Sequence, residues 1–527
     1  MRNFELPGRS AVMATRGMAA TSHPLASLTA IETLKAGGSA ADAAIAAAMV
    51  LNIAEPQMCG LGGDAFALIK PAGTEEVRAL NGSGRAHAGC SAAALRAAGH
   101  ETVPLHGILS VTPPGGVDAL CQLHQDYGRL PLAEVLAPAI RYADEGIPVA
   151  PRTAFDWAGD ISVLQGDARR FYTLDGAAPR AGQIFRAPGL AEVMRRIARE
   201  GRAGFYEGEV AEDMIASLNA LGGSHSHEDL AATRADCGAP VSGLHNGFEL
   251  MEHPPNGQGA TAILLLRILQ NFDLSRLDPL GAERAHLEAE AAKLACDARD
   301  RFIADPERMD PARLAAFLSD ETAARLAALI DPTRAMADPA RQSEAVHRDT
   351  ICLSVVDEDR MAVSLIYSIF WGFGSGLASA KFGINFQNRG AGFSLTPGHP
   401  NEAGPGRRPM HTIIPGMLRE NGRVVMPFGV MGGAYQPTGH ARLVSNLTDY
   451  GMELQQAIDA PRSFAGPEGL EVESGYSDAV RARLAELGHR VTAPEQPLGG
   501  AQAILIGGDG VLTGGSDPRK DGCALGY

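Results

Sequence analysis

The stretch TICLSVVDEDRMAVSLIYSIF, residues 350–370, decides the fold of this chain. Two runs rich in β-branched and aliphatic residues flank the polar tetrapeptide Asp357-Glu358-Asp359-Arg360. β-Branched residues fit a pleated sheet, and a short polar turn between two such runs is typical of a β-hairpin. The sequence therefore predicts two adjacent antiparallel strands, the first of which begins at Thr350.

The sequence differs in character on the two sides of this hairpin. Upstream, helices are predicted at 24–36, 39–51, 114–127, 132–144, 188–200, 209–221, 259–271, 283–304 and 311–330, with one strand near 66–69. Downstream, strands are predicted at 382–386, 412–418, 423–427, 502–506 and 511–513, and helices at 436–450, 453–459 and 476–487. A helix-rich part followed by a sheet-rich part indicates the α+β class, in which helices and sheets pack as layers.

Composition narrows the class of protein. The 527 residues are 45% hydrophobic and 20% charged, as in a globular protein with a substantial core. The net charge of −15 argues against nucleic acid or an anionic membrane as a partner, because both require a basic surface. Seven dispersed cysteines without paired spacing are typical of buried thiols in a reducing compartment. Because no apolar run fits a secretory signal or a membrane span, we expect a cytoplasmic protein.

Motifs for nucleotides and metals are missing from the sequence. It contains no GxxxxGK[ST], HExxH or GxSxG motif and no Cys or His pair with metal-site spacing. The Gly-rich segments 60–63 and 372–376 are interpreted as tight turns. His225 and His227 could bind a metal, but we expect them in a solvated loop. We therefore expect no metal and no organic cofactor.

The start of the hairpin offers a nucleophile. Thr350 follows Arg348-Asp349, and a threonine at the first position of a central strand can attack the carbonyl carbon just before it. Hydrolysis of the resulting ester would divide the chain into residues 1–349 and 350–527. The released α-amine has a pKa of about 7.7–8.0 in model peptides, which suits a base for its own hydroxyl. The residues alone leave open the alternative that Thr350 simply begins a strand.

Motifs along nearly the whole chain resemble the gamma-glutamyltranspeptidase family. The first part contains GMAATSHPLAS (17–27), AGGSAADAAIAA (36–47), NIAEPQMCGLGGDAF (52–66) and HPPNGQG (253–259). The second part contains TICLSVVD (350–357), FGSGL (373–377), RPMHTIIPGM (408–417), GGAYQPTGHARLV (432–444), AIDAPR (457–462) and the terminal SDPRKDGCALGY. So many ordered matches are not expected by chance.

The resemblance implies a four-layer αββα N-terminal-nucleophile hydrolase sandwich that cleaves itself into two associated subunits, 1–349 and 350–527; pairing of such heterodimers stays open. By the same likeness Thr350 is the nucleophile, Ser368 is the hydroxyl that orients it, and Gly432 and Gly433 supply the N–H groups of the oxyanion hole. Glycine suits this role because no Cβ obstructs an approach to about 3 Å. A plain strand serine and a simple turn are the alternatives at these positions.

Departures from the family pattern concern the groups that hold the substrate. Relatives that act on glutathione carry an Asn two residues after the orienting hydroxyl, where this chain has Phe370. Their acidic segment corresponds to QNRGAG at 387–392, so no acid stands at Gly392. Their paired serines correspond to His411-Thr412, and their early Arg falls near Ser83 and Arg85. The candidate substrate-binding residues are therefore Arg389, Phe370, Asn388, His411, Thr412 and Arg85.

This pattern most resembles the oxamate amidohydrolase branch of the family, which converts oxamate to oxalate and ammonia during purine breakdown. We therefore expect hydrolysis of a small anionic amide through an acyl–Thr350 ester. Arg389 is the candidate that binds the carboxylate, and a surface position for it is the alternative. Two other functions stay open. One is a gamma-glutamyltransferase or glutathione hydrolase with an altered pocket, and the other is an unprocessed binding protein of the same fold.

Overall fold

The predicted hairpin is present in the structure, a computed structural model that describes residues 5, 8–336, 350–466 and 468–527. Strand β10 (Ile351–Val356) pairs antiparallel with β11 (Ala362–Ser368). Asp357 closes the turn, since its Oδ1 accepts the N–H of Met361 at 2.9 Å. The acidic turn residues therefore have a structural function.

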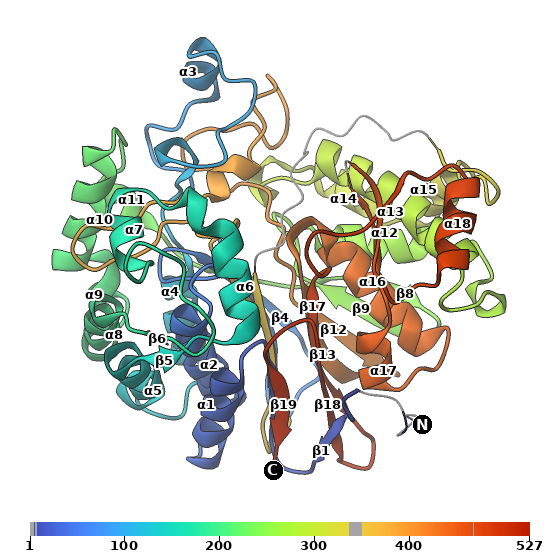
Figure 1. The fold of residues 1–527 in the computed structure, drawn as a ribbon, viewed down its shortest axis with the longest axis horizontal. Coiled ribbons are helices and arrows are strands. Elements are labelled where there is room, and N and C mark those ends of the chain that lie inside the picture. Colours follow the sequence, from blue (N-terminus) through green and yellow to red (C-terminus); the bar gives the residue numbers. More distant parts are fainter. Residues whose placement is uncertain (1–4, 6–7, 337–349, 467) are drawn as a thin grey trace.

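The hairpin lies in the middle of one of two seven-stranded sheets (Figure 1). The order of this first sheet is β19-β2-β10-β11-β3-β4-β7. Its other strands are β19 (Cys523–Gly526), β2 (Met18–Thr21), β3 (Asp64–Lys70), β4 (Arg78–Gly82) and β7 (Asp236–Gly238). The second sheet has the order β1-β18-β17-β13-β12-β9-β8. Its strands are β1 (Val12–Ala14), β18 (Leu512–Ser516), β17 (Gly500–Ile506), β13 (Arg423–Met431), β12 (Gly416–Glu420), β9 (Phe248–Glu252) and β8 (Val241–His245).

A layer of helices covers the outer face of the first sheet. It contains α1 (Pro24–Lys35), α2 (Ala40–Ala54), α4 (Gly116–Tyr127), α5 (Leu132–Glu145), α8 (Pro188–Glu200), α9 (Ala203–Tyr206) and α10 (Gly208–Ala220). Helix α2 begins at a capping box, in which Ser39 and Asp42 each accept the other's backbone N–H. Every residue of α2 is buried, because its many alanines allow close approach to the sheet and to α1.

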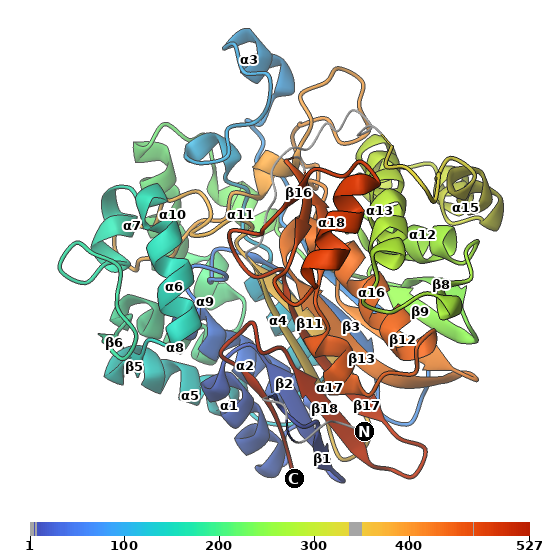
Figure 2. The same ribbon diagram turned by 45° about the vertical axis from the view of Figure 1, so that its right-hand side comes forward.

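A second helix layer covers the outer face of the second sheet (Figure 2). It contains α12 (Gly259–Leu269), α13 (Ala282–Phe302), α16 (Gln436–Thr448) and α17 (Leu454–Asp459), and α18 (Asp478–Glu486) packs on α13. The layer order is thus αββα, which confirms the predicted α+β sandwich. Within the described part of the chain, no helix is long and apolar enough to cross a membrane.

Several local predictions were wrong in detail. Residues 382–386 form only isolated bridges, to Gly62 and Ala378, because the segment is a loop that wraps the first sheet. The helix predicted at 311–330 is divided into α14 (Pro311–Phe317) and α15 (Asp320–Ala327), since Ser319 caps a new helix. The strand predicted at 412–418 begins only at Gly416. Three of the seven cysteines are buried and Cys237 is exposed; all seven are free thiols.

The smaller elements lie at the edges of the layers. They are α3 (Ala92–Ala97), α6 (Pro151–Asp160), α7 (Gly166–Phe171), α11 (His227–Ala232), β5 (Ile147–Pro148), β6 (Ile184–Phe185), β14 (Ser463–Gly466), β15 (Gly469–Val472) and β16 (Val491–Thr492). Two short 3-10 turns, η5 (Arg389–Gly392) and η6 (Gly433–Tyr435), carry candidate site residues.

Side-chain alternation decides which residues lie between the two sheets. On β10 and β11, Ile351, Leu353 and Leu365 pack against the helices, so Thr350, Cys352 and Ser368 face the second sheet. On β3 the same argument places Asp64 and Phe66 between the sheets. A small core of Phe66, Cys352, Ile366, Ile413 and Met431 fills this space and forms the floor of the candidate site.

Candidate active site

The candidate nucleophile is buried between the sheets. Thr350 and Ser368 are both 0% exposed, and the Thr350 hydroxyl donates to Ser368 Oγ over 3.5 Å. Ser368 Oγ also accepts the N–H of Phe370 at 2.9 Å. The backbone just after β11 therefore fixes the position of this hydroxyl. Asp349 and Arg348, the residues before the predicted cleavage point, lie outside the described residues. The structure thus brings the predicted nucleophile and its orienting hydroxyl together.

The predicted oxyanion turn lies at the end of β13, directly after Met431 of the floor. Gly432 and Gly433 have φ angles of 126° and 54°, a backbone region that favours glycine. A Cβ added to Gly432 would lie 2.9 Å from the Cα of Gly499, so a larger residue does not fit there. Backbone N–H groups at such a turn can stabilise a developing oxyanion.

Gln258, a residue without a role in the sequence prediction, holds this turn in place. Its buried Nε2 donates to the carbonyl of Gly433 at 2.9 Å and to that of Thr412 at 2.7 Å. Arg299 fixes the other end of the amide by donating to Gln258 Oε1 at 2.7 Å. The only signal in the sequence was its place in the HPPNGQG motif. Gln258 thus joins the oxyanion turn to the segment that carries His411.

Arg389 is buried, although a surface position was the alternative. Its side chain is 0% exposed, and its guanidinium lies 4.1 Å above the centre of the Phe370 ring. Nη1 donates to Thr412 Oγ1 at 3.2 Å, whereas Nε and Nη2 have no hydrogen-bond partner among the described residues. Burial lowers the pKa of Arg389 to about 9, and the charge of Asp64 opposes this shift. A buried guanidinium with two available N–H directions is suited to bind an anion.

His411 lies beside this guanidinium in a network centred on Asp64. Its Nε2 lies 2.9 Å from Ser83 Oγ and 3.0 Å from Asp64 Oδ2. Burial, followed by the charge of Arg389, lowers the pKa of His411 to about 3, so the ring is neutral. Burial raises the pKa of Asp64, but His411, Arg389 and the Gly115 amide outweigh it and leave the carboxyl ionised. Sequence reasoning did not assign Asp64, which follows the Gly-rich segment in NIAEPQMCGLGGDAF.

Two predicted binding residues have other partners. Asn388 bridges backbone, since Nδ2 donates to Leu105 O at 2.7 Å and Oδ1 accepts the N–H of Trp371 at 3.1 Å. It therefore shapes the loop around Phe370. The guanidinium of Arg85 donates to Glu307 at 2.8 Å and to Gly406 O at 3.0 Å, and its side chain is 31% exposed. The guanidinium of Arg85 thus bonds to groups near the surface, and the structure does not bring it to Arg389 and His411.

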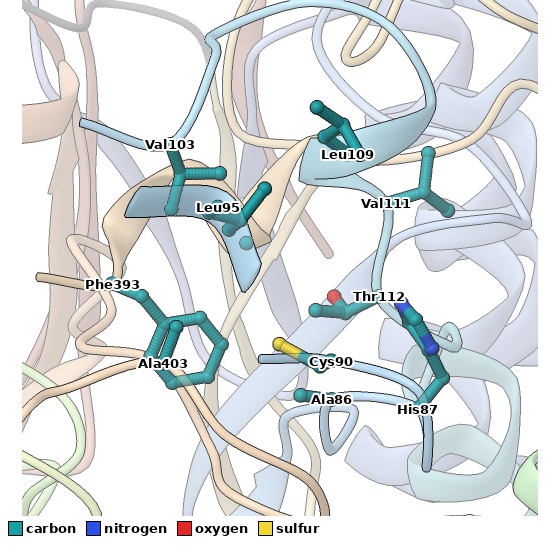
Figure 3. Close-up of a pocket in the computed structure, with 11 residues that line it drawn as sticks. Ala86, His87, Cys90, Leu95, Val103, Leu109, Val111, Thr112, Phe393 and Ala403 are labelled. Atoms are coloured by element: carbon teal, nitrogen blue, oxygen red, sulfur yellow. The ribbon is translucent and has the colours of Figure 1, made fainter. Parts of the chain in front are cut away.

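An apolar pocket lies behind the η5 turn (Figure 3). Its lining includes Ala86, Cys90, Val103, Gly390 and Phe393. Burial raises the pKa of Cys90 to about 11, so its thiol stays protonated and is a poor nucleophile. The pocket contains none of the candidate catalytic side chains, and its residues support the turn that carries Arg389.

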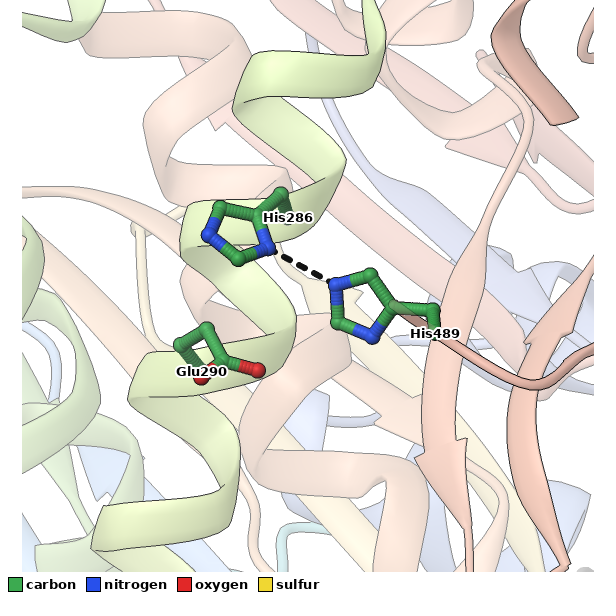
Figure 4. Close-up of side chains that lie close together, drawn as sticks. All are labelled: His286, Glu290 and His489. Atoms are coloured by element: carbon green, nitrogen blue, oxygen red, sulfur yellow. Dashed lines mark hydrogen bonds between the residues drawn. The ribbon is translucent and has the colours of Figure 1, made fainter. Parts of the chain in front are cut away.

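One group of side chains in the described residues has the composition of a metal site: His286, Glu290 and His489 (Figure 4). His286 Nδ1 lies 2.7 Å from His489 Nε2, and Nε2 lies 2.9 Å from Asp331 O. Glu290 accepts the Lys293 ammonium at 3.0 Å and the N–H of Met336 at 2.8 Å. The bonds to Asp331 and Met336 fasten residues 331–336 to α13. The absence of a metal requirement stays a prediction.

His225 differs from its prediction as a solvated loop residue. It is buried, because its ring packs on His87 at 4.1 Å and its Nε2 bonds to the carbonyl of Val111 at 3.1 Å.

Together these groups have the components of acyl transfer. A hydroxyl lies just before β10, a glycine turn follows Met431 of the floor, and a buried cation lies against the Phe370 ring. Such a site can bind an anionic acyl group and exclude water from it.

The sequence matches the Gamma-glutamyltranspeptidase family over residues 26–527. It is 37% identical to a glutathione hydrolase-like proenzyme of Bacillus subtilis, over 98% of this chain and 99% of that protein. It is also 37% identical to an oxamate amidohydrolase proenzyme of Klebsiella pneumoniae, over 98% of this chain and all of that one. The crystal structure of a cephalosporin acylase from Bacillus halodurans superposes with a TM-score of 0.92 at 38% identity, covering 100% and 99% of the two chains. The chain therefore belongs to the gamma-glutamyltranspeptidase family of N-terminal-nucleophile hydrolases.

Proposed function

We propose that the chain is a proenzyme that cleaves itself before Thr350 and then uses Thr350 as its nucleophile. The 3.5 Å contact between the hydroxyls of Thr350 and Ser368 supports this role, as does the turn at Gly432 and Gly433. Edman sequencing of the smaller piece should begin Thr-Ile-Cys-Leu-Ser, and Thr350→Ala should give one uncleaved, inactive chain. Any other N-terminus would remove Thr350 from this role.

For the substrate we propose a short anionic amide, with oxamate as the best candidate. The observation that carries this proposal is Arg389, a fully buried cation with two nitrogens that have no partner among the described residues. A single carboxylate would satisfy both through a bidentate pair. The identity to the Klebsiella oxamate amidohydrolase supports the same assignment.

The reaction follows from the arrangement. The carboxylate of oxamate binds Arg389, and Thr350 Oγ1 attacks the adjacent carboxamide carbon while the carbonyl oxygen takes charge beside Gly432 and Gly433. The C–N bond breaks, ammonia takes the proton carried by the Thr350 α-amine, and an oxalyl ester remains on Thr350. Water then hydrolyses this ester to oxalate and free enzyme. Ser368 keeps the attacking hydroxyl in place.

A gamma-glutamyl substrate fits this site less well. Its α-ammonium would enter next to Arg389, and Gly392 and Phe370 offer it no acid. We expect kcat/KM for oxamate to exceed that for γ-glutamyl-p-nitroanilide by at least about 100-fold, since an unpaired buried charge costs about 3 kcal/mol or more. Ammonia and p-nitroaniline release from one preparation measure both values.

The glutathione hydrolase-like relative is as similar to this chain as the oxamate amidohydrolase is, and it supports the second candidate function. Comparable efficiency on the two substrates, or a preference for the gamma-glutamyl compound, would contradict the oxamate assignment and favour a glutathione hydrolase or gamma-glutamyltransferase.

A further inference from the structure

His411 places an imidazole where glutathione-handling relatives carry a hydroxyl, and the charge beside it indicates which ring nitrogen holds the proton. Asp64 is ionised and accepts only, and its Oδ2 lies 3.0 Å from His411 Nε2. Nε2 also lies 2.9 Å from Ser83 Oγ, which accepts Asn256 Nδ2 at 3.2 Å. Because a lone pair on Nε2 would face the Asp64 carboxylate, we assign the hydrogen to Nε2 and the lone pair to Nδ1 of the neutral ring.

The ring is held rigidly in this orientation. Asp64 Oδ1 accepts three N–H groups, from Gly84 at 3.0 Å, Gly115 at 2.9 Å and Gln387 Nε2 at 2.9 Å. The His411 ring packs against Phe66, with their centroids 4.7 Å apart. Its backbone N–H and C=O are bonded to Asn256 and Gln258. Turning the ring would break the Asp64 contact, so Nδ1 stays an acceptor.

Nδ1 of His411 is buried and has no hydrogen-bond partner among the described residues, like Nε and Nη2 of Arg389. The third guanidinium nitrogen, Nη1, donates to the hydroxyl of the next residue, Thr412. The charge of Arg389 also contributes to the lowered pKa of His411, after burial. Two donor directions and one acceptor thus lie close together in a buried part of the site. Buried polar groups of this kind are normally paired.

The ligand that pairs with all three must offer acceptors to Arg389 and a donor to His411. A carboxylate next to a carboxamide does this along one edge, because an amide N–H and a carboxylate oxygen lie on adjacent carbons. A ligand ammonium would also donate, but it would bring a second positive charge next to Arg389. Burial, followed by the same repulsion, lowers the pKa of His411 and keeps its ring neutral. An uncharged N–H is therefore the favoured donor.

We propose that His411 is a specificity-determining residue whose Nδ1 accepts an N–H of the substrate's carboxamide. The site then selects unsubstituted amides over esters and over dialkyl amides of the same acid. This inference rests on the proposed function, since it assumes that Arg389 holds a carboxylate beside the amide. It adds an acceptor for the leaving nitrogen before the C–N bond breaks.

The test compares two substrates that form the same oxalyl ester on Thr350: oxamate and monomethyl oxalate, which has no N–H. Two variants test the functions of the two ring nitrogens of His411 separately. His411→Gln keeps an N–H that can reach Asp64 but has no acceptor at Nδ1, and His411→Asn keeps an acceptor near Nδ1 but does not reach Asp64. Gel analysis of cleavage and thermal melting confirm that each variant is processed and folded.

We expect His411→Gln to lower kcat/KM for oxamate at least tenfold while the value for the ester changes less than threefold. His411→Asn should restore part of the lost amide preference. An equal loss on both substrates in His411→Gln would mean that the ring only supports the site, and an unchanged amide-to-ester ratio would likewise overturn the proposal.

Failure of the proposed function gives a different result. If the wild type hydrolyses neither oxalyl compound, the short anionic substrate is wrong, and the same comparison moves to glutamine and its ester analogue, γ-methyl glutamate. An amide-selective loss in His411→Gln on that pair supports the role of Nδ1, and an equal loss excludes it.

Discussion

At the scale of single residues, burial gives Arg389 its function. An exposed arginine satisfies its guanidinium with water, whereas this one rests on Phe370 and shares one nitrogen with Thr412. The charge of Asp64 offsets only part of the cost of burying this guanidinium, and Asp64 Oδ1 already accepts three N–H groups. A substrate anion completes the charge pair, and binding energy then depends on this one side chain.

Replacing Arg389 should therefore weaken binding of an anionic amide. We expect Arg389→Ala to raise KM for oxamate at least about 100-fold, since loss of a buried charge pair costs about 3 kcal/mol or more. Cleavage before Thr350 should continue, because the carboxylate site takes no part in it. Arg389→Lys is the matched control: it keeps the charge without the planar fork and should recover only part of the affinity. Steady-state kinetics decide, and an unchanged KM in Arg389→Ala would contradict this role.

Several site residues could be predicted from the sequence because motifs specify them. Thr350, Ser368, Gly432 and Gly433 stand in ordered motifs, and Arg389 and His411 appeared as departures from the same pattern. Asp64 and Gln258 could not be given roles in this way, because their partners come from segments far away in the sequence. Arg85 shows the opposite error. Arg85 stands near the expected position in the sequence, but its side chain pairs with Asp305 and Glu307 and not with the candidate site.

At the scale of elements, a buried side-chain amide fastens the turn between β13 and α16 to the rest of the site. Gln258, just before α12, bonds the carbonyls on both sides of the candidate site, and Arg299 of α13 holds it from behind. The helix layer thereby sets the position of the oxyanion turn.

Removing this amide should slow the chemistry more than it weakens binding. In Gln258→Ala, the Thr412 and Gly433 carbonyls each lose one donor, and Gly433 keeps the backbone N–H of Gln436. A buried acceptor left without a partner costs about 1–3 kcal/mol. The turn can then relax, so we expect kcat to fall about 10- to 100-fold with KM changed less than threefold. Gln455→Ala is a matched control, since Gln455 bonds Ser516 O and Asp459 away from this turn. It should lower the melting temperature without lowering kcat; an equal kcat in Gln258→Ala and wild type would contradict the prediction.

Elements with a strong local pattern could be predicted, and those stabilised by neighbours could not. The 350–370 hairpin has β-branched runs and its own turn. By contrast, β2 (Met18–Thr21) reads MAAT, a sequence of weak strand propensity, and exists because β10 and β19 pair with it on both sides. The loop 382–386 has strand-like composition but pairs only through isolated bridges, because Gly383 turns the chain with a φ of 72°.

At the scale of the whole molecule, the two segments that meet at residue 350 are interleaved. In the first sheet β2 lies between β19 and β10, and β11 pairs with β3. In the second sheet β9 pairs with β12, and β1 pairs with β18. Neither segment can form either sheet alone, so we propose that 1–349 and 350–527 fold as one unit and stay together after cleavage.

This interleaving makes a thermodynamic prediction about the cleaved protein. Its two chains should run as one particle in native mass spectrometry and separate only when the sheets unfold. Because unfolding then releases two chains, mass action requires the apparent stability to rise with concentration, by about 1.4 kcal/mol for each tenfold increase. The uncleaved Thr350→Ala chain should unfold with a midpoint independent of concentration. Urea titrations followed by circular dichroism, at two concentrations a hundredfold apart, measure this difference. Two outcomes would contradict the shared core: chain separation while the strands remain folded, or a cleaved protein whose midpoint ignores concentration.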